Sequence, residues 1–300
     1  ARSGLAARAP TGTARSGLAA RAPTDKVIDV TDPGWPEAEW LARPELAGAP
    51  PMIWSRPPAR PGRVVVVAPH PDDEVLGVGA TMVHFLRDGW RVEVVTVTDG
   101  EAADPEATPE ARRRLGALRL QEQRRAWQEL GLDGVGAHHL HLPDGGLDRV
   151  EDELASALAG LIRAPGRPEG PGPAAWLLAT WRGDGHPDHE AVGRAAAEAV
   201  ASTSTSTATS TATATATATA LAEYPVWTWQ WARPGDERVP WSRARRVMTA
   251  PADAQAKSAA IGAFASQVGP AAGQDMAVLP PHVVARFLRP FEVLLVGEPT

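Results

Sequence analysis

From residue 63 onward, short apolar segments alternate with longer segments of helical spacing. The first of them, Arg63–Ala68, holds four consecutive valines without polar alternation, as expected of a strand buried on both faces of a parallel sheet. Strands that alternate with helices of this length indicate βαβ units joined by right-handed crossovers. We therefore predict an α/β fold with a Rossmann-like, mostly parallel sheet flanked by helices, in a single catalytic domain with surface extensions.

The sequence pattern gives approximate bounds for these elements. The expected strands are Arg63–Ala68, Arg91–Val97, Ala137–Leu142, Ala175–Thr180, Glu223–Trp231 and Phe291–Val296. The expected helices are Gly79–Arg87, Glu110–Leu130, Arg149–Ile162, His189–Ala201, Ala252–Gln267 and Pro281–Leu288. In the aromatic strand, Trp227, Trp229 and Trp231 would share one face, either in the core or as a platform for sugar rings, and the core is favoured.

Three segments lie outside this pattern. Residues 1–24 contain the same segment twice, at Ala1–Thr11 and Ala14–Thr24, which indicates a disordered or artificial tail. Residues 25–62 are a Pro/Trp-rich extension, and residues 63–300 would be the catalytic domain. Within that domain, residues 202–220 are almost purely Ser, Thr and Ala, and we expect a linker or lid there in preference to a strand.

Composition excludes several classes of protein. The chain has no cysteine, so any metal must be held by His, Asp or Glu. Its net charge of −6 disfavours binding to a nucleic-acid backbone. No apolar run approaches the ~20 residues of a membrane helix, and no secretory h-region of ~7–15 apolar residues is visible. We therefore expect a cytoplasmic protein without membrane insertion.

Two clusters of metal-ligating residues follow predicted strands. The first is His70-Pro71-Asp72-Asp73-Glu74, and the second is His186-Pro187-Asp188-His189. Each alone could be a solvated turn, since Pro and Asp favour turns. Because ligands bind at the carboxyl ends of strands in open α/β sheets, both clusters together indicate one metal site with nitrogen and oxygen ligands and an open position.

This pair of clusters resembles the signature of the zinc-dependent GlcNAc-phosphatidylinositol de-N-acetylase family, the PIG-L or LmbE-like proteins. The resemblance covers about residues 63–297. It includes Thr98-Asp99-Gly100-Glu101, Arg119 with Glu122, and Leu142-Pro143-Asp144-Gly145. It implies zinc ligands at His70, Asp73 and His189, with ferrous iron as the other candidate metal.

The resemblance also implies catalytic roles. Asp72 would be the general base, and His186 would stabilise the oxyanion and could also protonate the leaving amine. Arg119 and Asp144 would hold sugar hydroxyls. Trp181 and Arg182 precede the second cluster and are expected to line the pocket. Glu74 and Asp188 are expected to support the ligands or the start of a helix.

Other histidines and motifs carry less weight. His138, His139 and His141 fall on a predicted strand and are interpreted as structural. The chain has no Gly-x-Ser-x-Gly motif and no P-loop. Its only tyrosine, Tyr224, would have to reach the site to assist the reaction.

The resulting hypothesis is a zinc-dependent hydrolase that removes the acetyl group from an N-acetylglucosamine-type sugar on a small glycoside or natural product. The alternatives are a metal-dependent amidase for another N-acyl group in secondary metabolism, and a non-catalytic carbohydrate- or metal-binding protein. The expected partner is a small-molecule glycoside, with no nucleic acid; a homo-oligomer is compatible with the sequence.

Overall fold

The computed structural model describes residue 26 and residues 28–55, 62–103, 106–164, 172, 174–205, 219–270 and 276–297. The expected tail at residues 1–24 lies outside this part of the chain. So does most of the Ser/Thr/Ala tract; its described ends complete one helix and begin one strand.

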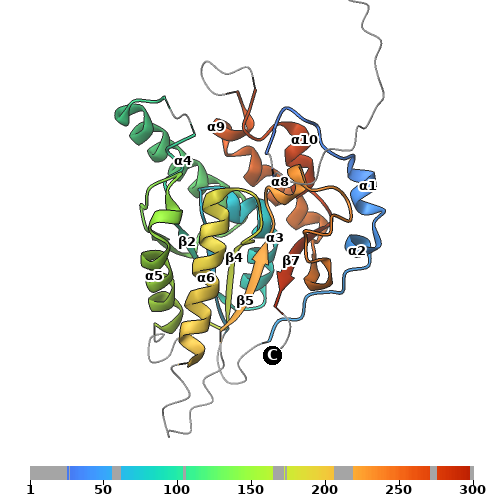
Figure 1. Cartoon of the computed structure of the whole chain (residues 1–300), viewed down its shortest axis with the longest axis horizontal. Helices are drawn as coiled ribbons and strands as arrows, with labels where there is room; N and C mark the ends of the chain where they lie inside the picture. Colours follow the sequence, from blue (N-terminus) through green and yellow to red (C-terminus); the bar gives the residue numbers. More distant parts are fainter. Residues whose placement is uncertain are drawn as a thin grey trace, which may run out of the picture.

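One seven-stranded sheet organises the molecule (Figure 1). Its strands are β1 (Arg63–Ala68), β2 (Arg91–Thr96), β3 (Gly136–His139), β4 (Trp176–Thr180), β5 (Ala220–Tyr224), β6 (Ala244–Met248) and β7 (Phe291–Val296). Their order across the sheet is β3-β2-β1-β4-β5-β7-β6. The strands β1 to β5 pair in parallel, and β7 pairs antiparallel with β5 and β6. The predicted α/β class and mostly parallel sheet are confirmed.

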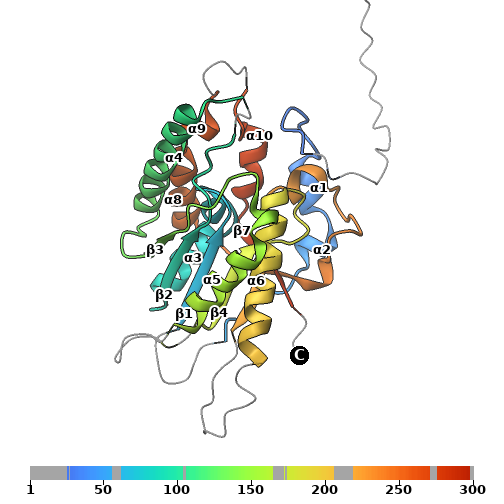
Figure 2. The same cartoon turned by 60° about the vertical axis from the view of Figure 1, so that its left-hand side comes forward.

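Helices cover both faces of the sheet (Figure 2). The longer ones are α3 (Asp73–Arg87), α4 (Pro109–Glu129), α5 (Glu151–Arg163), α6 (Pro187–Thr205) and α8 (Pro251–Gly262). The short helices are α1 (Glu37–Leu41), α2 (Pro44–Ala47), α7 (Thr228–Trp231), α9 (Ala265–Val268) and α10 (Pro281–Val284). Short 3₁₀ turns are η1 (Leu147–Arg149), η3 (Trp241–Arg243) and η4 (Ala285–Phe287).

The alternation of side chains along each strand divides the core into two layers. In β1, Val64 and Val66 belong to the larger cluster, which includes residues of α3, α4 and α8. Val65 and Val67 point to the opposite face and belong to the cluster formed with α5 and α6. The valine run is uniformly apolar because both faces of this central strand are covered.

The order of the strands creates a switch point between β1 and β4. The chain moves outward from β1 to β2 and β3, and then returns to the other side of β1 with β4. In open α/β sheets, the crevice at the carboxyl ends of such a strand pair is where ligands bind. The two histidine clusters follow these two strands directly.

The aromatic strand predicted at Glu223–Trp231 is wrong. The strand ends at Tyr224, and Thr228–Trp231 forms the short helix α7. Pro225 cannot donate to the sheet ladder, and the carboxylate of Asp184 accepts hydrogen bonds from the backbone N–H groups of residues 226, 227 and 228. A buried acid that lies far away in the sequence thus starts this helix. Trp229 and Trp231 are buried, as the core interpretation expected.

Two helices also differ from the prediction. Helix α3 begins at Asp73, six residues before the expected start, and is broken at Val78. The expected helix Ala252–Gln267 is divided into α8 and α9 near Phe264. The sequence pattern also did not predict β6, whose exposed side chains are interspersed with buried ones at the edge of the sheet.

Candidate active site

The turn between β1 and α3 brings the first cluster into position. The backbone N–H of His70 donates to Asp73 Oδ2 at 2.9 Å, which closes the turn over the start of the helix. Asp72 has φ 154°, which is a strained value for a residue other than glycine. Such strain costs on the order of 1–3 kcal/mol and occurs mostly at functional sites.

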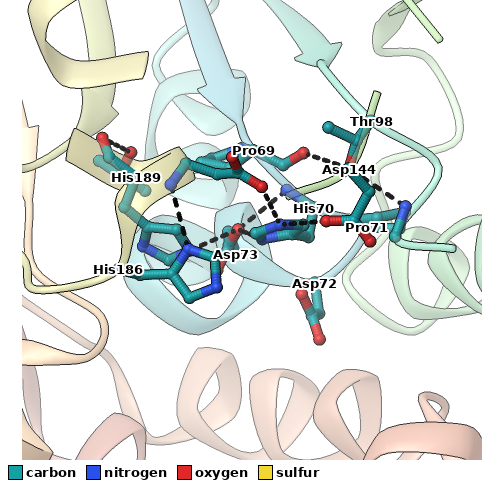
Figure 3. Close-up of polar contacts among 12 residues, drawn as sticks. Pro69, His70, Pro71, Asp72, Asp73, Thr98, Asp144, His186 and His189 are labelled. Carbon is teal, nitrogen blue, oxygen red and sulfur yellow. Dashed lines mark hydrogen bonds and ion pairs between the residues drawn. The ribbon is translucent and has the colours of Figure 1, made fainter. Parts of the chain in front are cut away.

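Three buried side chains form a compact group of potential metal ligands (Figure 3). Asp73 Oδ2 lies 3.1 Å from His70 Nδ1 and 3.2 Å from His189 Nε2. Tetrahedral zinc with bonds of ~2.0–2.1 Å separates its ligand atoms by about 3.3 Å. In addition, His189 Nε2 is buried and has no hydrogen-bond partner among the described residues. This is expected of a nitrogen atom that binds a metal ion. These residues therefore fit a zinc or ferrous ion.

The electrostatics of this group favour a cation. Burial alone would raise the pKa of Asp73, but the neighbouring His189 and His70 hold that pKa well below its usual range. Burial lowers the pKa of His189, yet Asp73 and Asp184 raise it to about 9. Positive charge is thus stabilised where the three ligand atoms converge, and a metal ion would take the place of these protons.

Further carboxylates orient the two ligand imidazoles. Asp184 Oδ2 lies 2.8 Å from His189 Nδ1, and both side chains are fully buried. His70 Nε2 lies 3.1 Å from Asp144 Oδ1 and 3.3 Å from Asp188 Oδ2. If the outward nitrogen carries the proton in each ring, the lone pairs of His70 Nδ1 and His189 Nε2 remain free for the metal.

Asp184 is the residue that the sequence analysis missed. It is completely buried and accepts hydrogen bonds from α7 as well as from His189. Its position two residues before His186 was the only available signal. No local pattern distinguishes such an acid from a turn former.

Asp72 is buried against Arg119. Arg119 donates to Asp72 Oδ2 at 3.1 Å and to the carbonyl oxygens of Gly100 and Pro71. Burial raises the pKa of Asp72 to about 6, although Arg119 opposes this shift. Figure 3 shows the carboxyl group of Asp72 beside the His70 turn but apart from the imidazoles. Arg119 was expected to hold a sugar hydroxyl, whereas these contacts favour a role in holding Asp72.

His186 belongs to the same site, and it is more exposed than His70 and His189. Its ring centre lies 5.0 Å from that of His70 and 4.8 Å from that of His189. Burial and these two imidazoles lower the pKa of His186 to about 3, so the ring is neutral at neutral pH. The backbone N–H of Asp188 donates to His186 Nδ1 at 3.3 Å, which places the ring proton on Nε2. His186, His70 and Asp188 also form an overlapping group of metal-ligating atoms.

Trp181 and Arg182, which were predicted to line the pocket, contact other side chains. Trp181 is buried and stacks on Trp231 at 6.4 Å between ring centres. Arg182 pairs with Glu223, with Nε 2.8 Å from Oε1. The pocket-lining role expected for these two residues stays a prediction.

The carboxyl group of Glu74 and the hydroxyl group of Tyr224 make hydrogen bonds that connect elements of the fold. Glu74 Oε1 accepts hydrogen bonds from Gln123 and Trp127 of α4, and burial raises the pKa of Glu74 to about 7. The hydroxyl of Tyr224 donates to the carbonyl of Val67 at 2.7 Å. Glu74 thus joins α3 to α4, and Tyr224 joins β5 to β1.

The histidines near β3 make contacts elsewhere. His138 Nε2 lies 3.2 Å from Glu93, and His141 Nδ1 lies 2.8 Å from Asp99. Neither takes part in a metal-ligating group among the residues that the structure describes. The strand ends at His139, so His141 lies beyond it and does not continue the predicted strand Ala137–Leu142.

The fold and the site define a doubly wound α/β protein with a His-Asp-His group at the switch point of its sheet. Residues 65–200 match the family model PIG-L, described as GlcNAc-PI de-N-acetylase. Among solved structures, a conserved protein from Thermus thermophilus resembles the chain at 25% identity and a TM-score of 0.54. This similarity covers 79% of the chain and 95% of that protein.

Curated relatives are 1D-myo-inositol 2-acetamido-2-deoxy-alpha-D-glucopyranoside deacetylases. The one from Streptomyces scabiei is 33% identical over an alignment of 166 residues. This alignment covers 46% of this chain and 48% of the relative. The one from Mycolicibacterium paratuberculosis is 34% identical over 154 residues, or 42% and 47%. The chain thus spans about half the length of the curated relatives that it matches.

Proposed function

We propose that the chain is a metal-dependent N-deacetylase that hydrolyses the acetamido group of an N-acetylglucosamine-type sugar on a small glycoside. One observation carries this proposal: one ligand atom each from buried His70, Asp73 and His189 converges at the candidate site, at spacings that suit a tetrahedral zinc ion. The match to the PIG-L family model and the deacetylase relatives support the same chemistry.

An amide resists hydrolysis because its carbonyl is a poor electrophile and water is a poor nucleophile. A zinc ion held by His70, Asp73 and His189 would supply Lewis acidity that addresses both properties. Ferrous iron could be held by the same ligand set.

Asp72 is the proposed general base. With a pKa of about 6, its carboxylate is largely ionised at neutral pH and can accept the proton of the attacking water. The carboxylate can then return this proton to the departing amine.

His186 is the proposed donor to the carbonyl oxygen. Because Nδ1 accepts the Asp188 N–H, Nε2–H can donate to the oxygen as negative charge develops there. The lowered pKa of His186 favours a neutral imidazole as this donor. A donor of this kind contributes on the order of 3 kcal/mol.

Metal stoichiometry combined with amine release tests the proposal. Wild type, His189→Ala and Asp72→Asn would be dialysed against the same low zinc concentration and assayed with N-acetylated glycosides. We expect about one metal per wild-type chain, far less in His189→Ala, and full metal with a rate lower by about 10²–10⁴ in Asp72→Asn. The matched control is His84→Ala, which removes an exposed histidine that pairs with Asp88.

A wild type without metal would overturn the metal-dependent hydrolase. Joint loss of metal and rate in Asp72→Asn would show that Asp72 supports the ligands instead of acting as the base. Metal binding with release of a longer acyl group, but not of acetate, would instead identify an amidase for another N-acyl substrate.

A further inference from the structure

A cavity of about 20 Å³ lies on the α3 side of the sheet, outside the candidate active site. Most of its lining is apolar or aromatic and comes from α3, α7, η4 and β7. Four charged side chains also line it: Lys257, Glu292, Arg286 and Arg289. All four are at least 95% buried.

The positive charges at this cavity outnumber the carboxylates that balance them. Lys257 Nζ lies 2.6 Å from Glu292 Oε1. Arg286 and Arg289 both pair with one carboxylate, that of Glu37 in α1. Three cations therefore face two anions, which leaves one positive charge in a buried environment where an uncompensated charge is costly.

Within the part of the chain that the structure describes, two guanidinium nitrogens of the cavity's arginines have no hydrogen-bond partner. They are Arg286 Nε and Arg289 Nη1, both of which are buried. The remaining nitrogens of these arginines bind Glu37 and the backbone carbonyls of Pro33 and Trp35. Glu292 cannot serve the free donors easily, because it already accepts from Lys257, Thr81 and the N–H of Ala80.

We propose that this cavity binds a monatomic anion, chloride being the one available in cells and buffers. An anion accepts hydrogen bonds from both free guanidinium donors and balances the excess charge at once. A water molecule, which needs about 10–15 Å³, could satisfy a donor but not the charge. A single-atom anion needs less room in this small cavity than an oxyanion of five heavy atoms such as sulfate.

The anion would join the N-terminal extension to the catalytic domain. The arginines hold Glu37 and the backbone at residues 33–35, whereas Leu76 and Gly77 at the same cavity belong to α3, the helix that begins with Asp73. An anion that binds only the folded chain should stabilise it in proportion to the logarithm of its concentration above the dissociation constant.

The thermal midpoint of the full chain in sodium chloride and in sodium gluconate, at equal ionic strength, tests this effect. We expect the midpoint to be higher in chloride by roughly 3 °C or more once the site is saturated. Arg289→Gln should abolish the difference. Arg194→Gln, which removes an exposed ion pair with Glu151, should keep it. Equal midpoints for wild type in the two salts would overturn the proposal.

Crystals of the wild-type chain grown in bromide provide a test that does not depend on the stability of a variant. Diffraction at the bromine absorption edge should give an anomalous peak between Arg286 and Arg289. A cavity without that peak would overturn the proposal, as would a peak combined with equal midpoints, because the second result means binding at crystal concentration only. Neither measurement depends on the deacetylase activity.

Discussion

At the scale of single residues, carboxylates with the same chemistry acquire different roles from their surroundings. Asp73 lies between two imidazoles, which keep it ionised, while Asp72 is buried against one arginine and has a pKa of about 6. Asp184 touches neither the ligand atoms nor solvent, and yet it orients His189 and starts α7. Residue type alone does not distinguish these roles.

Replacement of Asp184 by asparagine tests its orienting role. Asp184→Asn keeps the side-chain shape but removes the charge behind His189 Nδ1, so we expect zinc affinity to fall by about 10–100-fold. Competition with a chelator measures this affinity. Asp236→Asn is the control, since Asp236 bonds Arg238 away from the ligand set. Unchanged affinity in Asp184→Asn would restrict Asp184 to the capping of α7.

Replacement of Arg119 by glutamine tests how Asp72 is held. Arg119 lowers the pKa of Asp72, and a general base works when ionised, so kcat/KM should fall as pH decreases through that pKa. Without the guanidinium the pKa rises, and the acid limb of the profile should move to higher pH.

The outcome of this experiment also distinguishes the two roles considered for Arg119. A raised KM with an unmoved acid limb would support a contact with the sugar instead. Arg114→Gln is the matched control, because Arg114 lies on the same helix and pairs with exposed Glu110.

At the scale of elements, helix α3 shows where sequence-based prediction was limited. Its second part, from Gly79 onward, was predicted from its apolar spacing. The first part follows the turn at His70, and the break at Val78 is stabilised by Glu292, which accepts from the N–H groups of Ala80 and Thr81. A carboxylate on β7 thus caps the second part, and no local window of sequence contains it.

Close approach of α3 to β5 leads to a stability prediction. A Cβ atom on Gly77 would lie 2.2 Å from the buried ring of Tyr224, so Gly77→Ala should destabilise the protein by about 1–3 kcal/mol. Gly160→Ala in α5 meets no atom within 4 Å and should stabilise it by about 0.5–1 kcal/mol. Denaturant unfolding measures both. A stabilising Gly77→Ala would show that the helix and Tyr224 are not in close contact.

At the scale of the whole molecule, the N-terminal extension is part of the folded core. Trp40 is fully buried, and its ring contacts that of Trp229 at 5.3 Å between centres. The backbone N–H of Met52 donates to the carbonyl oxygen of Arg246, which attaches the extension to the edge strand β6. The extension and the α/β domain that follows it share one hydrophobic core. Among the described residues, no helix has the length and apolar character that crossing a membrane requires.

Truncation of Trp40 measures the contribution of this extension. Trp40→Ala should lower the free energy of unfolding by about 3–5 kcal/mol, since it empties a buried site between the extension and the domain. Its neighbour Leu41 is 38% exposed, and Leu41→Ala should cost much less. Similar small losses in both variants, seen in the same denaturant series, would mean that the extension adds little to the core.

The α/β class, the first four strands of the sheet and the two histidine clusters could be predicted from the amino-acid sequence. Each of these depends on local information: the valine run at Arg63–Ala68, the helical spacing between strands, and short motifs after β1 and β4. The convergence of the clusters followed from one general property of parallel sheets, whose strands end at a common edge.

Features that depend on contacts between distant residues became visible in the folded chain. Asp184 turned a predicted aromatic strand into helix α7, and Glu292 capped a helix more than two hundred residues earlier. Likewise, Arg119 of α4 came to lie against Asp72, which is 47 residues earlier in the sequence. Carboxylates and guanidinium groups that bind residues far away in the sequence do not follow a periodic sequence pattern, because the packing of the folded chain determines their partners.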